Sequence, residues 1–368
     1  MKKKILTFLL TGAMTLSLFA GVGMTANAAP DDEKLTEAII EKNLEMDKNV
    51  TTPEVSFTFE IEGVSVDGKT TETPPTISDK TLTFASTDAG TTQGNLKTVN
   101  KATANILEGI TFPHAGVYVY KVTETANTYS AAAGETMTYS QAEYEMTVMV
   151  INDGTSNVKV EKVVLEESKD DEGEDQTDQK TQTMAFTNVY GKNTTLEVSK
   201  ETVGDYADKT KQFTFTLTLG NAATETGTKQ YEGTITRKDT STEEITVTIG
   251  TPQEFTLGDG DSLYIENLPV GTICNITETG AEDYTPSLTY TLGNSDPQQT
   301  QGQVGTDFAC GPFEMAEVSN TLDFTNTYKE VPTPTGILTN YGPAILVMLV
   351  AVAGIIACIA LRRRSNVR

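Results

Sequence analysis

The sequence has few of the residues on which enzyme active sites and disulfide scaffolds usually depend. It contains three cysteines and one histidine, and no His or Cys cluster has the spacing of a metal site. The histidine, His114, precedes a strand, and no hydroxyl nucleophile has a candidate base. We therefore expect no enzyme activity toward a substrate, no metal and no cofactor. Cys358 lies in an apolar C-terminal run, which leaves Cys274 and Cys310 either as a disulfide pair or as buried thiols.

Positive charge is also scarce. There are 27 Lys and Arg residues against 51 Asp and Glu residues, and the formal net charge is −24. Seven of the positive charges lie in the two terminal segments, so the chain between them has a formal net charge of −31. Such a surface repels phosphate backbones, and this excludes nucleic acid as a partner.

The two ends of the chain predict export and membrane retention. Residues 1–28 have a lysine-rich start, an apolar stretch and a small-residue end at Ala26-Asn27-Ala28, which is typical of a secretory signal peptide. Residues 344–361 form an uncharged apolar run long enough to span a bilayer, and four arginines follow it. A buried core helix is the alternative interpretation of this run.

The segment "KEVPTPTGI", Lys329 to Ile337, precedes the apolar run. Together with the run and its basic tail it resembles the cell-wall sorting signal of Gram-positive surface proteins. The resemblance implies that a sortase cuts between Thr335 and Gly336 and joins the Thr335 carbonyl to an amine, with cell-wall peptidoglycan as the final anchor. Pro332 and Thr333 stand where the usual signal has Leu and Pro, which affects the choice of sortase. A proline-rich spacer is the alternative.

The periodicity of the remaining chain predicts an all-β protein. Apolar and polar residues alternate in "VSFTFEIE" (55–62), "YEMTVMV" (144–150), "FTFTLTL" (213–219) and "ITVTI" (245–249). Turn signals separate these runs, and no amphipathic helix of useful length is present. The acidic run at 170–178 lacks the ligand spacing of a calcium loop, and we interpret it as a solvated loop.

The strands repeat in order, which predicts two copies of one domain. "SFTFEIEG" is matched by "QFTFTLTLG", "ITFPHAGVYVYKVTET" by "IENLPVGTICNITETG", and "MAFTNVY" by "LDFTNTY". The first domain covers residues 35–190 after a short N-terminal arm at 29–34, and the second covers 194–328 before the sorting region at 329–368. Only "GKN" separates them, which predicts a stiff end-to-end rod.

Each domain has three polar residues in phase with apolar residues of its strands. A lysine opens each domain, an asparagine closes it, and a glutamate lies between them. Burial of such groups requires an explanation, because a lone buried charge or amide is costly. An edge position open to water would explain any one of them, but six matches in two copies favour a shared role. The residues are Lys42, Glu124 and Asn188 in the first domain, and Lys200, Glu278 and Asn326 in the second.

These residue types together predict a self-modification reaction. Burial favours the neutral amine of the lysine, which is nucleophilic, and the protonated form of the glutamate. The amine can attack the asparagine side-chain carbonyl while the carboxylic acid polarises that carbonyl and shuttles protons, so that ammonia leaves. The product is an intramolecular isopeptide bond.

At this level the chain closely resembles the backbone pilins of Gram-positive bacteria, in particular the streptococcal T-antigen type. The resemblance covers essentially the whole chain after the signal peptide, including "EKNLEMDK", "AGVYVYKVTE", "LPVGTICNITE", both "FTN" segments and the sorting region. It implies two immunoglobulin-like β-sandwiches, with bonds Lys42–Asn188 and Lys200–Asn326 assisted by Glu124 and Glu278. It also implies a cell-surface polymer of identical subunits that supports adhesion, with a host ligand left open. A wall-anchored adhesin that does not polymerise, or a minor pilin, is the alternative.

The amine that receives Thr335 of a neighbouring subunit is predicted to be Lys180. A head-to-tail rod places the acceptor away from the linker, and Lys180 is eight residues upstream of Asn188 and follows the acidic run. The resembling pilins use a lysine at nearly the same place. Lys169 and Lys34 are the alternatives.

Overall fold

The computed structural model describes residues 34–155 and 157–329, together with helical positions at 344, 346–348 and 350–352. The signal peptide (1–28), the sortase motif at Thr335 and Gly336, and most of the expected spanning helix (344–361) lie outside the described residues. Among the residues that are described, no helix is both long enough and apolar enough to cross a membrane.

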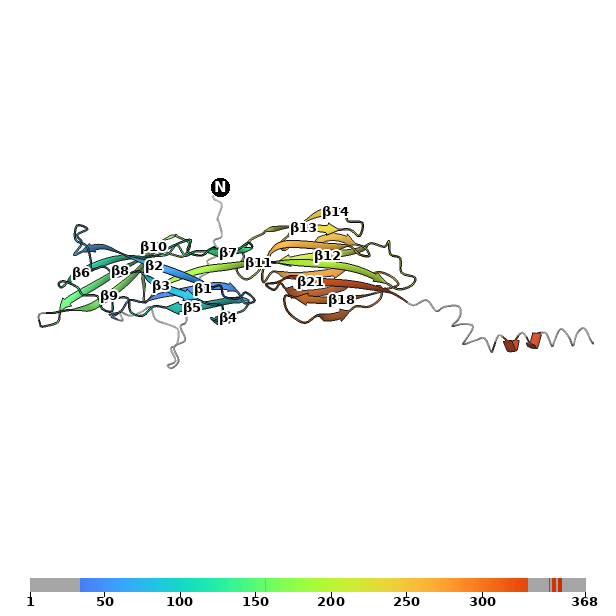
Figure 1. Ribbon diagram of the computed structural model, residues 1–368, viewed down its shortest axis with the longest axis horizontal. Helices are drawn as coiled ribbons and strands as arrows, with labels where there is room; N and C mark the ends of the chain where they lie inside the picture. The colour runs from blue at the N-terminus through green and yellow to red at the C-terminus, as the bar shows by residue number, and fades with distance from the viewer. Residues whose placement is uncertain (1–33, 156, 330–343, 345, 349, 353–368) are drawn as a thin grey trace, which may run out of the picture.

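The described chain is all-β, as predicted, and forms two lobes arranged end to end (Figure 1). We refer to residues 35–190 as domain 1 and to residues 194–328 as domain 2. The strands of domain 1 are β1 (Ile40–Asp47), β2 (Val55–Val66), β3 (Lys80–Phe84), β4 (Thr91–Gln93), β5 (Leu96–Ala102), β6 (Gly116–Glu124), β7 (Glu135–Thr138), β8 (Glu143–Asn152), β9 (Val158–Lys169) and β10 (Asp175–Thr181). Strand β11 (Met184–Val203) enters both domains, and domain 2 continues with β12 (Phe213–Gly220), β13 (Gln230–Thr236), β14 (Thr242–Thr248), β15 (Gln253–Leu257), β16 (Ser262–Pro269), β17 (Ile273–Glu278), β18 (Tyr284–Leu292), β19 (Gln298–Gln301), β20 (Phe308–Glu314) and β21 (Asn320–Tyr328).

Each domain consists of two sheets that enclose an apolar core. In domain 1 a six-stranded sheet of order β10-β9-β8-β6-β2-β3 faces the strands β7, β11, β1, β5 and β4. In domain 2 a four-stranded sheet of order β15-β12-β17-β20 faces the strands around the second half of β11. Alternation places the phenylalanines of β2 and β12 inside, where Phe57, Phe59, Phe213 and Phe215 are fully or almost fully buried.

Strand β11 joins the two domains without a loop. The sequence predicts a linker at Gly191-Lys192-Asn193, but these residues continue a 20-residue strand. Their backbone is hydrogen-bonded to both domains: Asn193 N–H donates to Gly134 O, at 2.7 Å, and Lys192 O accepts from Val270 N–H, at 2.8 Å. The junction therefore has the backbone pairing of a sheet, because each side of β11 has a neighbour.

Side chains also connect the domains around β11. Lys48 Nζ of domain 1 lies 2.7 Å from Glu314 Oε2 of domain 2. Thr51 donates to Glu317 through its backbone N–H, at 3.0 Å, and through its hydroxyl, at 2.8 Å. Val270 of domain 2 is buried in the apolar core of domain 1. These contacts fix the angle between the domains as well as their connection.

The tightest contact at the junction is between Gly271 of domain 2 and Asp47 at the end of β1. Gly271 has a φ of 88°, and a Cβ added there would lie 2.0 Å from Asp47 Oδ2. Asp47 is only 1% exposed, so its carboxylate has little room to move away. A side chain at position 271 is therefore excluded both by the backbone conformation and by the neighbouring domain.

We expect Gly271→Ala to lower the free energy of unfolding by more than the roughly 1–2 kcal/mol of a left-handed alanine. The matched control is Gly250→Ala, which has a φ of 76° but nothing within 4 Å of the added Cβ. Calorimetric unfolding of both variants measures the difference. Equal losses in the two variants would contradict a tight junction at Asp47.

One prediction about the end of domain 1 is wrong in part. The acidic run at 170–178 is expected to be a loop, but β10 begins at Asp175 and extends the six-stranded sheet as its edge strand. Strand β10 runs antiparallel to β9, with Lys180 opposite Glu166. The chain then turns back at residues 182 and 183 into β11, so Lys180 and Asn188 do not lie on one extended strand.

Candidate functional site

Both lysine–asparagine pairs lie on parallel strands in the same register. In domain 1, β1 pairs with β11 so that Lys42 is opposite Phe186 and Leu44 is opposite Asn188. In domain 2, β11 pairs with β21 so that Lys200 is opposite Phe324 and Thr202 is opposite Asn326. Side chains two residues apart on a strand share a face. Each lysine is therefore a diagonal neighbour of its asparagine on the inner face of the sheet.

The glutamates come from the facing sheet of each domain. Glu124 ends β6 opposite Phe59 of β2, and Glu278 ends β17 opposite Phe215 of β12. The neighbouring phenylalanines of the same strands cover the amines: Lys42 Nζ lies 4.8 Å from the ring centre of Phe57. The site is thus assembled from both sheets, and only the folded sandwich brings its members together.

The domain 1 site is a fully buried hydrogen-bonded triad. The side chains of Lys42 and Glu124 are both 0% exposed, and Lys42 Nζ donates to Glu124 Oε2 at 2.7 Å. Asn188 donates through its amide nitrogen to Glu124 Oε1, also at 2.7 Å. The Asn188 carbonyl oxygen accepts a hydrogen bond of 2.6 Å from the backbone N–H of Ser140.

The domain 2 site has the same three residues with looser pairing. Lys200 Nζ lies 3.6 Å from Glu278 Oε1, and the Asn326 amide nitrogen donates to the same oxygen. Among the described residues, Asn326 Oδ1 and Glu278 Oε2 have no hydrogen-bond partner although both atoms are buried. Domain 2 thus lacks, within that part of the chain, a counterpart of the Ser140 donor.

Burial sets the protonation of both sites. Loss of solvent lowers the pKa of Lys42 to about 8, although the nearby Glu124 carboxylate opposes the change. The same cause lowers the pKa of Lys200 to about 8, with Glu278 opposing. Burial also raises the pKa of Glu124 and of Glu278 above the ordinary value for a glutamate. Both shifts favour the passage of a proton from lysine to glutamate, which leaves a neutral amine beside a carboxylic acid.

This arrangement can form an amide bond between the two side chains. The neutral lysine amine attacks the asparagine Cγ, the C–N bond to the amide nitrogen breaks, and that nitrogen leaves as ammonia. The glutamate can carry the proton from the attacking amine to the leaving nitrogen, because it contacts both groups in domain 1.

From the sequence we expect the glutamate to polarise the asparagine carbonyl. The position of the glutamate in the structure differs from this expectation. In both domains the glutamate contacts the amide nitrogen of the asparagine rather than its carbonyl oxygen. In domain 1 the contact to the carbonyl oxygen comes from the Ser140 N–H, which can stabilise negative charge that develops there. A backbone donor from a loop before β8 leaves no pattern in the sequence, so periodicity could not identify it.

The other predicted residues are not members of the two triads. Cys274 and Cys310 are both buried free thiols, and Cys310 lies near enough to Glu278 for the carboxylate to add to burial in raising the pKa of the thiol. Lys180 is exposed on the edge strand β10. Of the alternative acceptors, Lys169 Nζ lies 3.0 Å from Glu143 Oε1 and Lys34 forms an ion pair with Glu161. No group of three or more potential metal ligands is present among the described residues.

Comparison with known proteins gives two matching family models. Residues 39–191 match the Spy0128-like isopeptide containing domain, and residues 194–328 match a domain of unknown function, DUF7601. The chain is 29% identical over 367 residues to a pilin of Streptococcus pyogenes serotype M1, an alignment that covers 95% of this chain and 97% of the pilin. The first domain thus matches the isopeptide-containing domain family, and the chain over almost its whole length is similar to a streptococcal pilin.

Two further similarities concern the same group. This chain is 35% identical over 147 residues to the pilus tip adhesin Cpa of Streptococcus pyogenes. That alignment covers 39% of this chain and 18% of the adhesin. A crystal structure of the major pilin from Streptococcus pyogenes is 24% identical, covers 80% of this chain and 98% of that chain, and has a TM-score of 0.37.

The mass of the folded pilin tests the chemistry of the two sites. We expect the intact mass to be lower than the sequence mass by one ammonia for each bond, since each bond forms by loss of one ammonia. Glu124→Ala and Glu278→Ala should each restore one ammonia, because the proton carrier is then absent. Mass spectrometry of the intact protein and of its crosslinked peptides measures this. An unchanged wild-type mass would rule out the reaction.

Proposed function

We propose that this pilin is the structural shaft subunit of a covalently polymerised, wall-anchored pilus. Its likeness to the pilin of Streptococcus pyogenes, which spans 97% of that protein, carries the proposal. The likeness to the tip adhesin spans only 18% of the adhesin and favours a shared domain over a shared role. In this proposal both domains are immunoglobulin-like sandwiches, and the pilus supports adhesion to a host surface.

The only catalysis in this proposal is self-modification. Each domain forms its own bond, Lys42–Asn188 or Lys200–Asn326, with Glu124 or Glu278 as proton carrier. The register of the parallel strand pairs and the burial of all three groups support this step. A bond between neighbouring strands at the start and the end of a domain prevents the intervening chain from extending.

In this proposal the assembly of the pilus depends on the sorting motif of one subunit and on Lys180 of the next. A sortase cuts between Thr335 and Gly336 and joins Thr335 to the Lys180 amine of a neighbouring copy, and the last subunit is joined to peptidoglycan. Lys180 suits this role because it is exposed on an edge strand, and among the described side chains no carboxylate lies within ion-pair distance of it. The ammoniums of Lys169 and Lys34 are each held by a glutamate.

Lys180→Arg should collapse the polymer to wall-linked monomer. Arginine keeps the positive charge but does not provide a usable nucleophile. A blot of cell-wall extract measures the result: wild type gives a covalent ladder of high mass, and the variant gives one band. Lys169→Arg is the matched control and should leave the ladder intact. If the ladder survives in Lys180→Arg, the acceptor is a different residue.

Thr335→Ala together with Gly336→Ala should abolish wall linkage and leave the pilin in the membrane fraction. The motif then has no scissile bond that the sortase accepts, so neither polymer nor wall-linked monomer can form. Fractionation of cells into wall and membrane, followed by a blot, measures the shift. Wall attachment that persists in this variant would refute the interpretation of the motif.

A further inference from the structure

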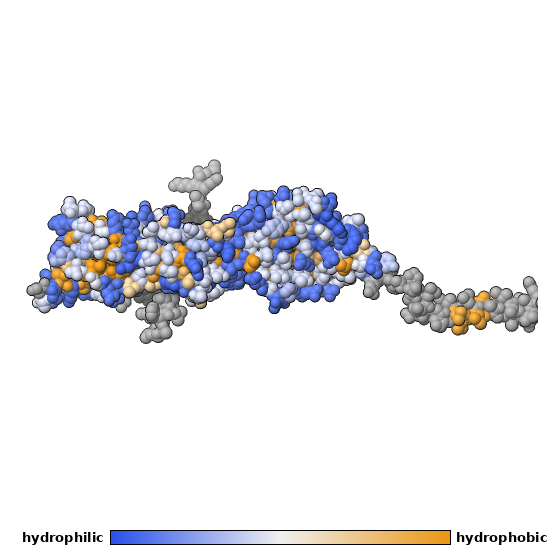
Figure 2. Space-filling model, viewed as in Figure 1, coloured by the Kyte–Doolittle hydropathy of each residue, from blue (hydrophilic) through white to orange (hydrophobic). Residues whose placement is uncertain are grey.

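The outer face of the six-stranded sheet of domain 1 carries an exposed apolar patch. Eight large hydrophobic side chains between residues 34 and 329 are exposed, and four of them lie at the end of domain 1 remote from domain 2. Figure 2 shows hydrophobic residues gathered at this end of the molecule. We call the four residues the apolar patch: Val64 (40% exposed), Val117 (37%), Met149 (37%) and Ile151 (38%).

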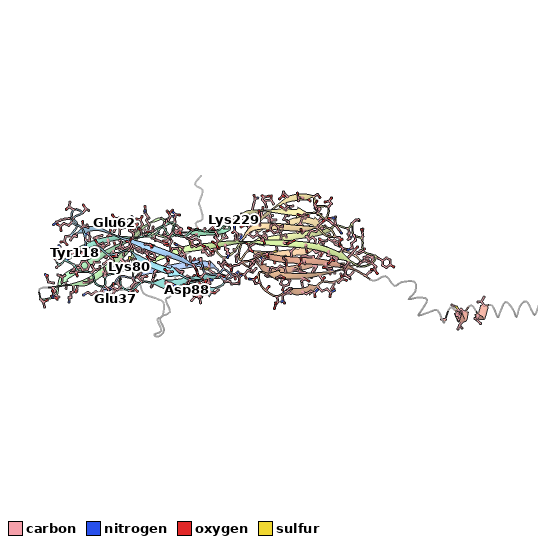
Figure 3. All side chains as sticks on the ribbon, viewed as in Figure 1. Glu37, Glu62, Lys80, Asp88, Tyr118 and Lys229 are labelled. Atoms are coloured by element: carbon pink, nitrogen blue, oxygen red, sulfur yellow. The ribbon has the colours of Figure 1, made fainter. Side chains whose placement is uncertain are left out.

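Strand register shows that the patch is continuous. Val117 of β6 is directly opposite Met149 of β8, and Ile151 follows two residues later on the same face. Val64 lies at the bulge of β2 beside β6. Tyr118, which Figure 3 labels at this end of domain 1, points inward and is fully buried, so its neighbour Val117 points outward.

Lys180 lies on the same outer face of the sheet as the apolar patch, and farther from the free end of domain 1. Lys180 is opposite Glu166 of β9, and Glu166 is opposite Glu145 of β8. From Glu145 to Ile151 the strand advances six residues, which is about 20 Å at roughly 3.3 Å per residue. Strand β8 also lies two strand spacings of about 4.8 Å from β10, so Lys180 and Ile151 are about 22 Å apart in a straight line. The half-buried Val164 of β9 lies along this path.

The segment of the neighbouring copy that ends in Thr335 has a matching length. Lys329, the residue directly after domain 2, forms an ion pair with Asp283 of that domain. Six residues, 330–335, connect this point to the bond at Lys180, and in an extended proline-rich form they span about 19 Å. Their sequence, "EVPTPT", contains Val331 and two prolines and one charged residue.

We propose that the apolar patch is the docking track for residues 330–335 of a second copy of this chain. The segment passes over Ile151 and Met149 of β8, with Val117 of β6 at its side, and crosses β9 to deliver Thr335 to Lys180. Its span of about 19 Å, together with the reach of the Lys180 side chain, is close to the distance of about 22 Å from Lys180 to Ile151, and its apolar side chains match the exposed surface. This inference rests on the proposed function, specifically on Lys180 as the acceptor.

Oxidation of Met149 tests the docking. We compare wild-type polymer extracted from cell walls with the wall-linked monomer of Lys180→Arg, using hydrogen peroxide and peptide mapping of methionine sulfoxide. Met149 should oxidise several-fold more slowly in the polymer, because the segment covers it. Met137, half-buried on β7 beside the domain junction, is the internal control and should react equally in both samples.

A second variant identifies what covers the patch. Val331→Ser weakens the apolar contact of the segment and leaves Thr335, Gly336 and Lys180 in place, so polymer should still form with Met149 less protected. If Met149 stays fully protected, another surface covers the patch and the proposal fails.

The outcomes separate this inference from the proposed function. A ladder that survives in Lys180→Arg overturns the acceptor and the docking together. A ladder that collapses, with Met149 equally reactive in polymer and monomer, overturns the docking and leaves the proposed function intact.

Discussion

The structure of each domain depends on one buried contact between an amine, a carboxyl group and an amide. A lone lysine in an apolar core would cost several kcal/mol, and removal of either partner would leave an uncompensated group. In domain 1 all the polar atoms of the triad have partners. The proposed reaction removes the charge of the lysine, because a secondary amide is neutral, while the amide and the glutamate still need hydrogen-bond partners. Closing a loop of more than a hundred residues also contributes about 5 kcal/mol in the chain-entropy account of crosslinks.

The two sites differ in how firmly they hold the electrophile. In domain 1 the Ser140 N–H fixes the Asn188 carbonyl, and Lys42 contacts Glu124 directly. In domain 2 the amine and the carboxylate are 3.6 Å apart. Both sites keep the same strand register, so the register does not account for the difference. The two domains thus share the parallel pair of strands that carries the lysine and the asparagine. The backbone N–H contact to the asparagine carbonyl oxygen is present in domain 1 and has no counterpart among the described residues of domain 2.

Much of the site could be predicted from the sequence because burial follows the period of a strand. Lys42 and Lys200 stand in phase with apolar neighbours, and both are buried as that phase requires. The contact between Glu124 and Lys42 also follows, because a domain has a single core in which inward polar groups can meet. The position of a residue in the alternating pattern shows which face of the sheet its side chain is on, but not which residue of another strand it meets. Periodicity alone therefore did not give the register between β1 and β11.

Other features could not be predicted, each for a physical reason. The acidic residues before Lys180 have low strand propensity, yet pairing with β9 makes them an edge strand. The segment "GKN" has the composition of a turn, and only neighbours from both domains keep it extended. The Ser140 contact is made by a backbone group, which every residue but proline has.

The continuity of β11 determines which atoms carry tension along a pilus. If Lys180 receives the preceding subunit, force enters at β10 and follows the backbone through β11 to Lys200. There the proposed side-chain bond to Asn326 would transfer the force to β21 and on to Thr335. Most of domain 2, nearly all of domain 1 and the proposed Lys42–Asn188 bond would then lie outside the path of the force. In this proposal the two bonds have different roles: Lys200–Asn326 carries the tension, and Lys42–Asn188 holds the first and last strands of domain 1 together.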